Sequence, residues 1–471
     1  MKIELLLKSL LVACAVSFSC AVYATDITAT GSGDWESTLP DAPWPNGIVP
    51  GTNDSADVED PFVVTVRSNA AAAYVYGSGT VVMAANSLLN IGDTNGANGT
   101  FELANLDTSA PGNTVLYSNN PFWAKHQNYF NLVFSNTVTT NSIDFFSGFV
   151  NSEDPAAAMT VAGDMTVVGK IKVQQGADFT VLGNLVLGTN SSWDCSSFNL
   201  TVASNTTIGG LMLDLDGASG SNYFGGGVLV SSNAIGWNVS DVTQWGIGGS
   251  LTNQGLIVGK GYGSITFSGT GSIVGKPIKI PTIGVSGTYL IGTTITLITN
   301  TPTLTGTLVF DLANTNQIVM QTYATNPMTL YYAGKLNVIN SGPLPAAGTT
   351  YKFFSATNYN GAFDTTSYPP LSPGLNWIDN LLTSGSITVS GSAPQSIVIS
   401  SPQYNPATHQ YTLTWTSTPA ATYSVQYSSD LVTDPFANNV LASGIPSGGT
   451  VTTTTVTLPA NKTGFLRIST P

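Results

Sequence analysis

Three segments of the chain align without gaps and decide the fold: Thr160-Val-Ala-Gly-Asp-Met-Thr-Val-Val-Gly169, Thr180-Val-Leu-Gly-Asn-Leu-Val-Leu-Gly-Thr189 and Thr201-Val-Ala-Ser-Asn-Thr-Thr-Ile-Gly-Gly210. Their first residues lie 20 and then 21 positions apart, and weaker copies follow at 227–236, 249–259 and 264–275. A short unit recurring at this spacing is typical of a solenoid, in which each circuit of the backbone, or coil, buries its apolar side against its neighbours.

Within these units, apolar residues alternate with polar ones, as at Met165, Val167, Ile171 and Val173. A period of two indicates strands with one inward face. Gly-Asn, Gly-Thr and Ser-Asn pairs separate the strands and are typical of turns. The pattern therefore predicts an all-β protein, a right-handed parallel β-helix over residues 131–390.

The composition agrees with this fold. Only 8% of the 471 residues are charged and the formal net charge is -13, whereas soluble proteins usually carry about 25% charged residues. Stacked Thr, Ser and Asn on the outer faces avoid like-charge ladders at the strand spacing of about 4.8 Å. The acidic balance, with two Arg, argues against nucleic acid as a partner.

The N-terminus has the pattern of a targeting segment. Lys2 and Lys8 precede an apolar run at 10–22, and Ala24 ends a small-x-small cleavage motif, so residues 1–24 are predicted to be a signal peptide. The run is shorter than the roughly 20 residues of a membrane span, and none is expected in the mature chain. Lipidation at Cys14 is the less favoured alternative, because Cys14 follows Lys8 by only six residues.

The rest of the chain divides by composition. Residues 25–130 are richer in Trp, Pro and acids and are predicted to form the first coils and a cap, because open solenoid ends pair with other chains. Residues 391–395 form a predicted linker, and 396–471 a β-sandwich. The strands expected in this sandwich are 397–399, 411–415, 423–427, 450–458 and 465–468.

Three groups of motifs resemble one family. They are Asp34-Trp35 with Asn46–Asp54 and Ala56–Val58; Gly334–Val338 with Gly348–Phe354, Pro370–Trp377 and Gly385–Val389; and Tyr411–Trp415 with Tyr423–Leu431 and Phe465–Ile468. Together they resemble secreted bacterial β-helix proteins with autotransporter-associated β-strand repeats and a C-terminal fibronectin-type-III-like module. The resemblance implies an exported protein, extracellular or at the cell surface in association with the outer membrane.

An enzyme acting on polysaccharide is the first functional alternative, as a glycoside hydrolase or a lyase. Hydrolysis needs two or three converging carboxylates, and Asp214 and Asp216 share one strand face, with Asp194 expected near them in the previous coil. The simpler interpretation is that Asp216 begins a turn and Asp214 faces solvent. No assembled catalytic motif is found, so no catalytic residue is assigned.

Calcium is the one cofactor alternative; otherwise no cofactor is expected. Asp54, Asp57, Glu59 and Asp60 form the densest acidic cluster, which suits a weak calcium site or, as the favoured interpretation, a solvated rim. Zinc is not expected, because His126, His409 and Cys195 lie far apart and no paired-ligand spacing exists. Cys195 is predicted to be a buried structural thiol.

Aromatic residues in loop-like sequence are the candidates for ligand binding. Trp44, Phe122, Trp123 and Tyr129 are the residues that could stack on sugar faces, with packing inside the end of the solenoid or under a long loop as the favoured interpretation. The leading hypothesis is a non-catalytic surface, adhesive or extracellular-matrix solenoid, and a carbohydrate-binding protein is the other alternative. The expected partners are surface polysaccharide or other envelope proteins.

Overall fold

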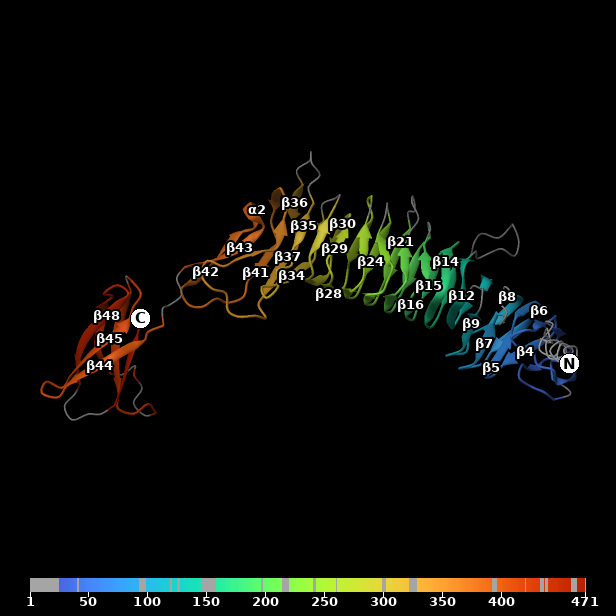
Figure 1. Cartoon of the computed structure of the whole chain (residues 1–471), viewed down its shortest axis with the longest axis horizontal. Helices are drawn as coiled ribbons and strands as arrows, with labels where there is room; N and C mark the ends of the chain where they lie inside the picture. Colours follow the sequence, from blue (N-terminus) through green and yellow to red (C-terminus); the bar gives the residue numbers. More distant parts are fainter. Residues whose placement is uncertain are drawn as a thin grey trace, which may run out of the picture. The chain divides into compact units, whose positions relative to one another are not determined.

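The structure is a computed structural model, and nearly all of its elements are strands (Figure 1). It describes residues 25–39, 42–92, 99–118, 121–124, 128–145, 158–195, 198–213, 220–239, 243–259, 261–298, 302–321, 328–391, 396–419, 421–432, 436, 439–458 and 464–470. The predicted all-β fold and parallel β-solenoid are confirmed, with about 10 turns. The predicted signal peptide at 1–24 lies outside the described residues.

The chain divides into two compact units. The first contains residues 1–343, 351–369 and 380–386, and the second contains 344–350, 370–379 and 387–471. Three parallel sheets build the solenoid of the first unit, and each coil contributes one strand to each sheet.

Sheet 1 contains one short strand from each of nine successive coils. Its strands, in order, are β11 (Asn128–Tyr129), β13 (Met159–Val161), β15 (Phe179–Val181), β18 (Leu200–Val202), β21 (Ser221–Phe224), β24 (Gln244–Ile247), β27 (Ser264–Phe267), β30 (Thr282–Val285) and β33 (Thr303–Leu304).

Sheets 2 and 3 begin in two long strands, β12 (Asn131–Phe145) and β14 (Met165–Gln175), which run across both. Sheet 2 continues through β16 (Leu185–Leu187), β19 (Thr206–Ile208), β22 (Val228–Val230), β25 (Leu251–Asn253), β28 (Thr270–Gly275), β31 (Thr288–Gly292), β34 (Thr307–Asp311), β37 (Lys335–Ile339) and β41 (Thr365–Ser367). Sheet 3 continues through β17 (Ser192–Asp194), β20 (Leu211–Leu213), β23 (Gly236–Val239), β26 (Ile257–Gly259), β29 (Ile278–Ile280), β32 (Ile295–Leu297), β35 (Ile318–Met320) and β39 (Phe354–Ser355).

The N-terminal coils add further parallel strands. β5 (Asn69–Ala72), β7 (Leu88–Ile91) and β9 (Thr114–Ser118) stack in turn and lead into β12. A separate sheet, sheet 4, contains β1 (Asp26–Thr28), β3 (Ser55–Asp57), β6 (Tyr74–Met83), β4 (Val63–Val66), β2 (Gly33–Asp34), β8 (Gly99–Asp107) and β10 (Pro121–Ala124). A short 3-10 helix, η1 (Pro45–Gly47), lies in the first coil.

The last solenoid coils are less regular. β36 (Thr329–Tyr332) pairs in parallel with β40 (Asn358–Gly361), and the short helix α2 (Leu381–Ser384) ends at Gly385 in the left-handed conformation. The remaining strands of this stretch are β38 (Thr350–Lys352), β42 (Leu375–Asn380) and β43 (Ser386–Gly391).

The register of the coils is the one that the aligned repeats imply. Thr160 lies beside Thr180, and Thr180 beside Thr201, all on the outer side of sheet 1. The valines that follow them, Val161 and Val181, are fully buried and continue an inward column. Alignment of the repeats in sequence therefore superimposes the residues that stack in space.

The turns between sheets 1 and 2 are held by side chains that bond the backbone of the next coil. Asn131 Oδ1 accepts from the Asp164 N–H at 2.9 Å, and Asp164 Oδ1 accepts from the Asn184 N–H at 2.7 Å. Asn184 Oδ1 then accepts from the Asn205 N–H at 3.2 Å, and Asn205 Oδ1 from the Gly227 N–H at 2.8 Å. This turn ladder satisfies donors that no strand pairs and joins five successive coils.

Glycines replace the turn ladder in the later coils. A Cβ built on Gly269, Gly287 or Gly306 would overlap the carbonyl oxygen of the glycine in the preceding coil. These turns approach so closely that only a residue without a side chain fits.

Residues 396–471 of the second unit contain, in their described part, six antiparallel strands in two sheets. One sheet has the order β44 (Ile399–Asn405), β45 (Gln410–Thr416), β48 (Val451–Thr457), and the other has β47 (Val440–Pro446), β46 (Thr422–Ser428), β49 (Phe465–Ser469). Leu413 and Trp415 from the first sheet pack in one core with Tyr423 and Val425 from the second, as in a sandwich. Strand β47 was absent from the strands expected from the sequence, because its residues show no clean inward alternation.

Replacing Asn184 by Ala tests the turn ladder. The variant loses the acceptor for Asn205 and the donor that lies 3.0 Å from Asp164 Oδ1, so we expect the free energy of unfolding to fall by about 1–2 kcal/mol. Urea unfolding followed by circular dichroism measures it. Asn358→Ala is the control, because the exposed Asn358 side chain makes no hydrogen bond within the described part of the chain; equal losses in both variants would contradict a specific role for the ladder.

Replacing Gly287 by Ala tests the close approach of the later turns. The added methyl meets the Gly269 carbonyl oxygen, and relief requires the two coils to separate, which we expect to cost about 1–3 kcal/mol. Gly31→Ala is the matched control, because a Cβ at Gly31 has nothing within 4 Å. Thermal melting of both variants should show a lower midpoint for Gly287→Ala alone.

Candidate functional site

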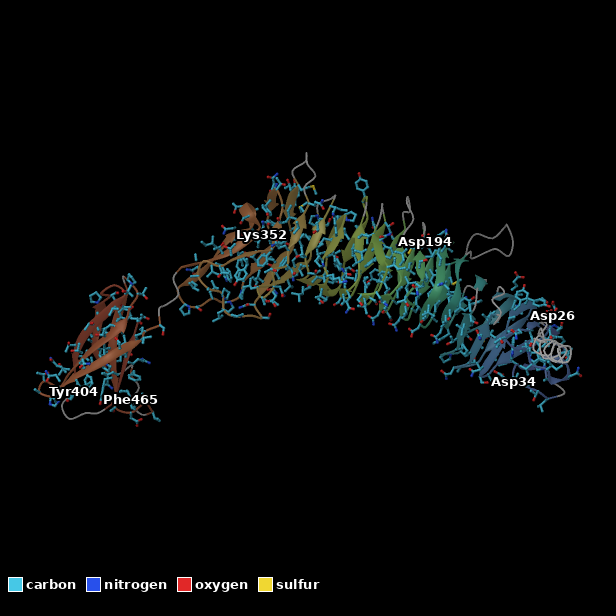
Figure 2. The ribbon with its side chains drawn as sticks, viewed as in Figure 1. Asp26, Asp34, Asp194, Lys352, Tyr404 and Phe465 are labelled. Carbon is cyan, nitrogen blue, oxygen red and sulfur yellow. The ribbon has the colours of Figure 1, made fainter. Side chains whose placement is uncertain are left out.

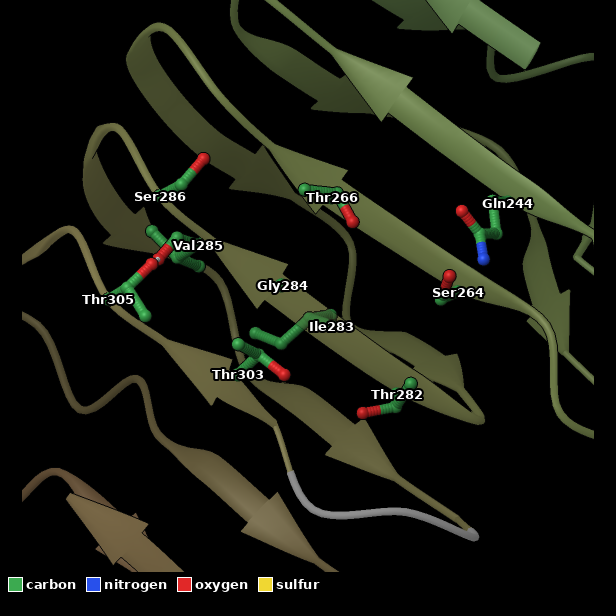
Figure 3. A pocket seen from close by; sticks show the side chains of 10 residues that line it. All are labelled: Gln244, Ser264, Thr266, Thr282, Ile283, Gly284, Val285, Ser286, Thr303 and Thr305. Carbon is green, nitrogen blue, oxygen red and sulfur yellow. Dashed lines mark hydrogen bonds between the residues drawn. The ribbon is translucent and has the colours of Figure 1, made fainter. Parts of the chain in front are cut away.

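An open groove lies on the outer side of sheet 1, across β24, β27, β30 and β33 (Figure 3). It encloses about 290 Å³ and is lined by Gln244, Ser264, Thr266, Thr282, Ile283, Gly284, Val285, Ser286, Thr303 and Thr305. The side chains of Ile283 and Val285 are buried, so these two residues offer only their main chain. None of the ten lining residues is ionisable, and the groove therefore presents hydroxyls, one amide and backbone.

The register of sheet 1 explains the groove. Gln244, Ser264 and Thr282 form one outward row, because they are aligned on successive strands. A second row runs through Gly246, Thr266, Gly284 and Thr303. The missing side chain at Gly284 leaves a hollow between two threonines, and a Cβ there would lie 2.9 Å from Thr266 Oγ1.

Tyr223 extends the second row by one coil, because it is aligned with Gly246 on the neighbouring strand. Its ring leans across β24: a Cβ on Gly246 would lie 2.7 Å from the ring atom Cδ2, and one on Gly248 would lie 2.8 Å from the hydroxyl. The side chain is 42% exposed. An aromatic ring supported by a glycine and open to solvent lies beside a row of hydroxyls, an arrangement that suits a sugar ring.

The structure corrects the prediction of sugar stacking by Trp44 and Tyr129. Trp44 is fully buried, packs edge-to-face on Trp35 at 4.9 Å and donates its indole N–H to the Trp35 carbonyl at 2.8 Å. Tyr129 is buried, and its hydroxyl lies 2.9 Å from that of Tyr117. Both rings pack inside the first coils, which is the interpretation that the sequence favoured. Phe122 and Trp123 belong to β10, and their side chains lie outside the described part.

The four predicted calcium ligands do not converge on one point in the structure, although Asp57 and Glu59 lie near each other. Asp54 accepts from the Gly51 N–H at 3.0 Å, whereas Asp57 accepts from the Thr28 hydroxyl at 3.0 Å. Glu59 accepts from the Ser78 hydroxyl, and Asp60 is exposed. Among the described residues, no group of three or more acidic, His or Cys side chains is placed to hold a metal ion. The structure therefore does not assemble these four residues into a calcium site.

A second polar cluster, which the sequence did not indicate, lies on sheet 4. Tyr76 donates to both carboxylate oxygens of Asp26 at 2.6 Å, and Tyr74 donates to Glu102 at 2.6 Å. The two rings stack at 5.0 Å. Burial, and after it the bond to the carboxylate, raises the pKa of both tyrosines, so they stay neutral donors. These hydrogen bonds link β6 to β1 and to β8. The hydroxyl groups of Tyr74 and Tyr76 are both used as donors in them.

The third carboxylate of this cluster is Asp57, which is 9% exposed and lies beside Tyr76 in the register. Burial raises the pKa of the Asp57 carboxyl, and the charges of Glu59 and Asp26 raise it further, against a lowering by the Thr28 hydroxyl.

The proposed hydrolase carboxylates give no assembled site among the described residues. Asp194 is fully buried, and its Oδ2 lies 3.7 Å from Lys172 Nζ. Asp214 and Asp216 lie outside the described residues. Figure 2 shows Asp194 in the middle coils and Asp26 in the N-terminal coils, on different parts of the solenoid. Cys195 is fully buried, as predicted.

Comparisons of this chain with protein-family models, curated proteins and solved structures find no match. In the part of the chain that the structure describes, no helix has the length and apolarity needed to cross a membrane.

Replacing Asp57 by Asn tests the environment of the acidic cluster. Because the folded protein binds the Asp57 proton more tightly than the unfolded chain, the free energy of unfolding falls as pH rises above 3.8, the ordinary aspartate value. The side-chain amide of the variant still offers an oxygen that accepts from the Thr28 hydroxyl, but it does not titrate, so this contribution to the pH dependence of stability is lost. We expect Asp57→Asn to gain stability over the wild type between about pH 4 and pH 7. Urea unfolding across this range measures it, and parallel curves would show the expectation to be mistaken.

Proposed function

We propose that this protein is an exported, non-catalytic surface β-solenoid that adheres to polysaccharide through the groove beside Tyr223. The observation that carries the proposal is the chemistry of this face: hydroxyls and one amide line the groove, with no ionisable lining residue, and the exposed ring of Tyr223 lies on the neighbouring strand. Sugars are bound by such combinations of hydrogen bonds and aromatic faces.

The same chemistry favours binding without turnover. Cleavage of a glycosidic bond needs a protonated carboxyl group and a second carboxylate beside the sugar. Three carboxylates with assigned partners lie elsewhere: Asp26 and Glu102 accept hydrogen bonds on sheet 4, and Asp194 lies next to Lys172. A polysaccharide held in this groove meets no acid catalyst among the ten lining residues.

The proposed location rests on the sequence. The N-terminal pattern at 1–24 supports export, and the motifs that resemble autotransporter-associated β-strand-repeat proteins with a fibronectin-type-III-like module support a place at the cell surface. The single cysteine that cleavage at Ala24 leaves, Cys195, supports a fold held by burial and hydrogen bonds, without intramolecular disulfides.

Replacing Tyr223 by Ala tests the proposal. We expect the migration of the purified wild-type protein to be slowed in gels that contain an uncharged polysaccharide. Tyr223→Ala should weaken this binding about tenfold, which corresponds to about 1.4 kcal/mol of binding free energy. Tyr223→Phe keeps the ring and should bind like the wild type.

Tyr404→Ala is the matched control, because Tyr404 has a similar exposed fraction, 47%, on the second unit. A reducing-sugar assay on the same mixtures should remain at background. Release of reducing ends, or unchanged binding by Tyr223→Ala, would contradict the proposal.

A further inference from the structure

We propose that the bound polysaccharide is an uncharged, extended chain that crosses the strands of sheet 1, with one sugar residue on each coil from Tyr223 to Thr303. This inference rests on the proposed function and adds the direction, the register and the class of the ligand.

The short strands of sheet 1 argue against a glycan that runs along a single strand. β27 covers Ser264–Phe267 and β30 covers Thr282–Val285, so each offers only two outward positions before the backbone turns. A glycan along one strand would leave the sheet after those two side chains. A glycan across the strands meets β21, β24, β27, β30 and β33 in order.

The spacing of the coils fits the crossing direction. Paired strands lie about 4.8 Å apart, which is close to the length of one sugar residue in an extended β-linked chain. Successive sugars therefore meet equivalent positions on successive coils. Parallel register supplies those positions, because Gln244, Ser264 and Thr282 repeat one row of hydrogen-bonding groups at this interval.

The second row provides room for the chain. Gly246 and Gly284 alternate with Thr266 and Thr303 along it. The hollow at Gly284 admits a ring between two hydroxyls, and the glycine at position 246 lets the Tyr223 ring lean across the sheet. A side chain at Gly284 would fill the path that the glycan needs, and one at Gly246 would displace the Tyr223 ring.

Charge selects the class of polysaccharide. The lining is neutral, while the chain carries a net charge of -13. An acidic glycan finds no lysine or arginine among the lining residues and is repelled by the protein as a whole. An uncharged hexose polymer exchanges its water hydrogen bonds for those of Ser, Thr and Gln side chains without this cost.

The experiment is calorimetric titration of the full chain with cello-oligosaccharides of increasing length, as uncharged, extended probes. We expect affinity to rise with each added residue up to about five, the number of coils crossed, and then to level off. Acidic oligogalacturonides of equal length should bind at least tenfold more weakly. A plateau at two residues, or equal binding of the acidic series, overturns the inference.

Gly284→Thr supplies the second readout, because it completes a threonine row with a residue that strands favour. We expect it to lower the affinity for the longest oligosaccharide at least tenfold while the melting temperature stays near that of the wild type. Thr160→Val, on the same face of β13 and outside the groove, should bind normally.

The outcomes separate the two proposals. If long chains bind and respond to Tyr223→Ala but not to length or to Gly284→Thr, the groove binds glycan in another direction and only this inference fails. If the wild-type protein binds neither polysaccharide nor oligosaccharide, both fail.

Discussion

The stacking of one coil on the next, in a single register, is the constraint on which the structure depends. A parallel strand pair slipped by one residue would turn every inward valine of sheet 1 to solvent. The inward column itself resists such a slip, since Val161, Val181 and Val202 are fully buried. The turn ladder adds a second, polar determinant of register, because Asp164 and Asn184 accept from specific N–H groups of the following coil.

The same repetition sets the chemistry of the surface. Where the repeat is kept, an outward side chain has a counterpart of the same type about 4.8 Å away on the next coil, so an ionisable residue there would face a like charge. Thr160, Thr180 and Thr201 avoid this conflict. Carboxylates do occur in the N-terminal coils, where they accept hydrogen bonds from specific side chains. Asp26, for example, accepts from the Tyr76 hydroxyl. Stacking therefore favours a face without charge, and the groove beside Tyr223 lies on such a face.

The sequence predicted the fold well where the repeats are clear, and the site poorly. The alignment of the repeats at Thr160, Thr180 and Thr201 anticipated the spatial register, because a solenoid maps equivalent positions onto one another. Trp44 was named as a candidate for sugar stacking because its flanking prolines resemble an exposed loop, whereas the ring is buried against Trp35 in the first coil. The Tyr74–Tyr76 cluster was missed because its carboxylate partners come from strands distant in sequence, at Asp26 and Glu102.

Tyr223 shows what further signal the repeats contained. It occupies the outward position that Thr201 holds in the preceding coil and Gly246 in the next. When glycine holds the equivalent position on the next coil, a large ring has room to lie across that coil. Tyr223 and Gly246 are far apart in sequence, and only the strand register shows that they are neighbours. In this solenoid, departures from the repeat at outward positions locate the candidate groove, whereas motifs within one segment did not. The alternation of Tyr, Gly, Thr, Gly and Thr along five strands forms a shaped path on a face that hydroxyl stacking alone would leave flat.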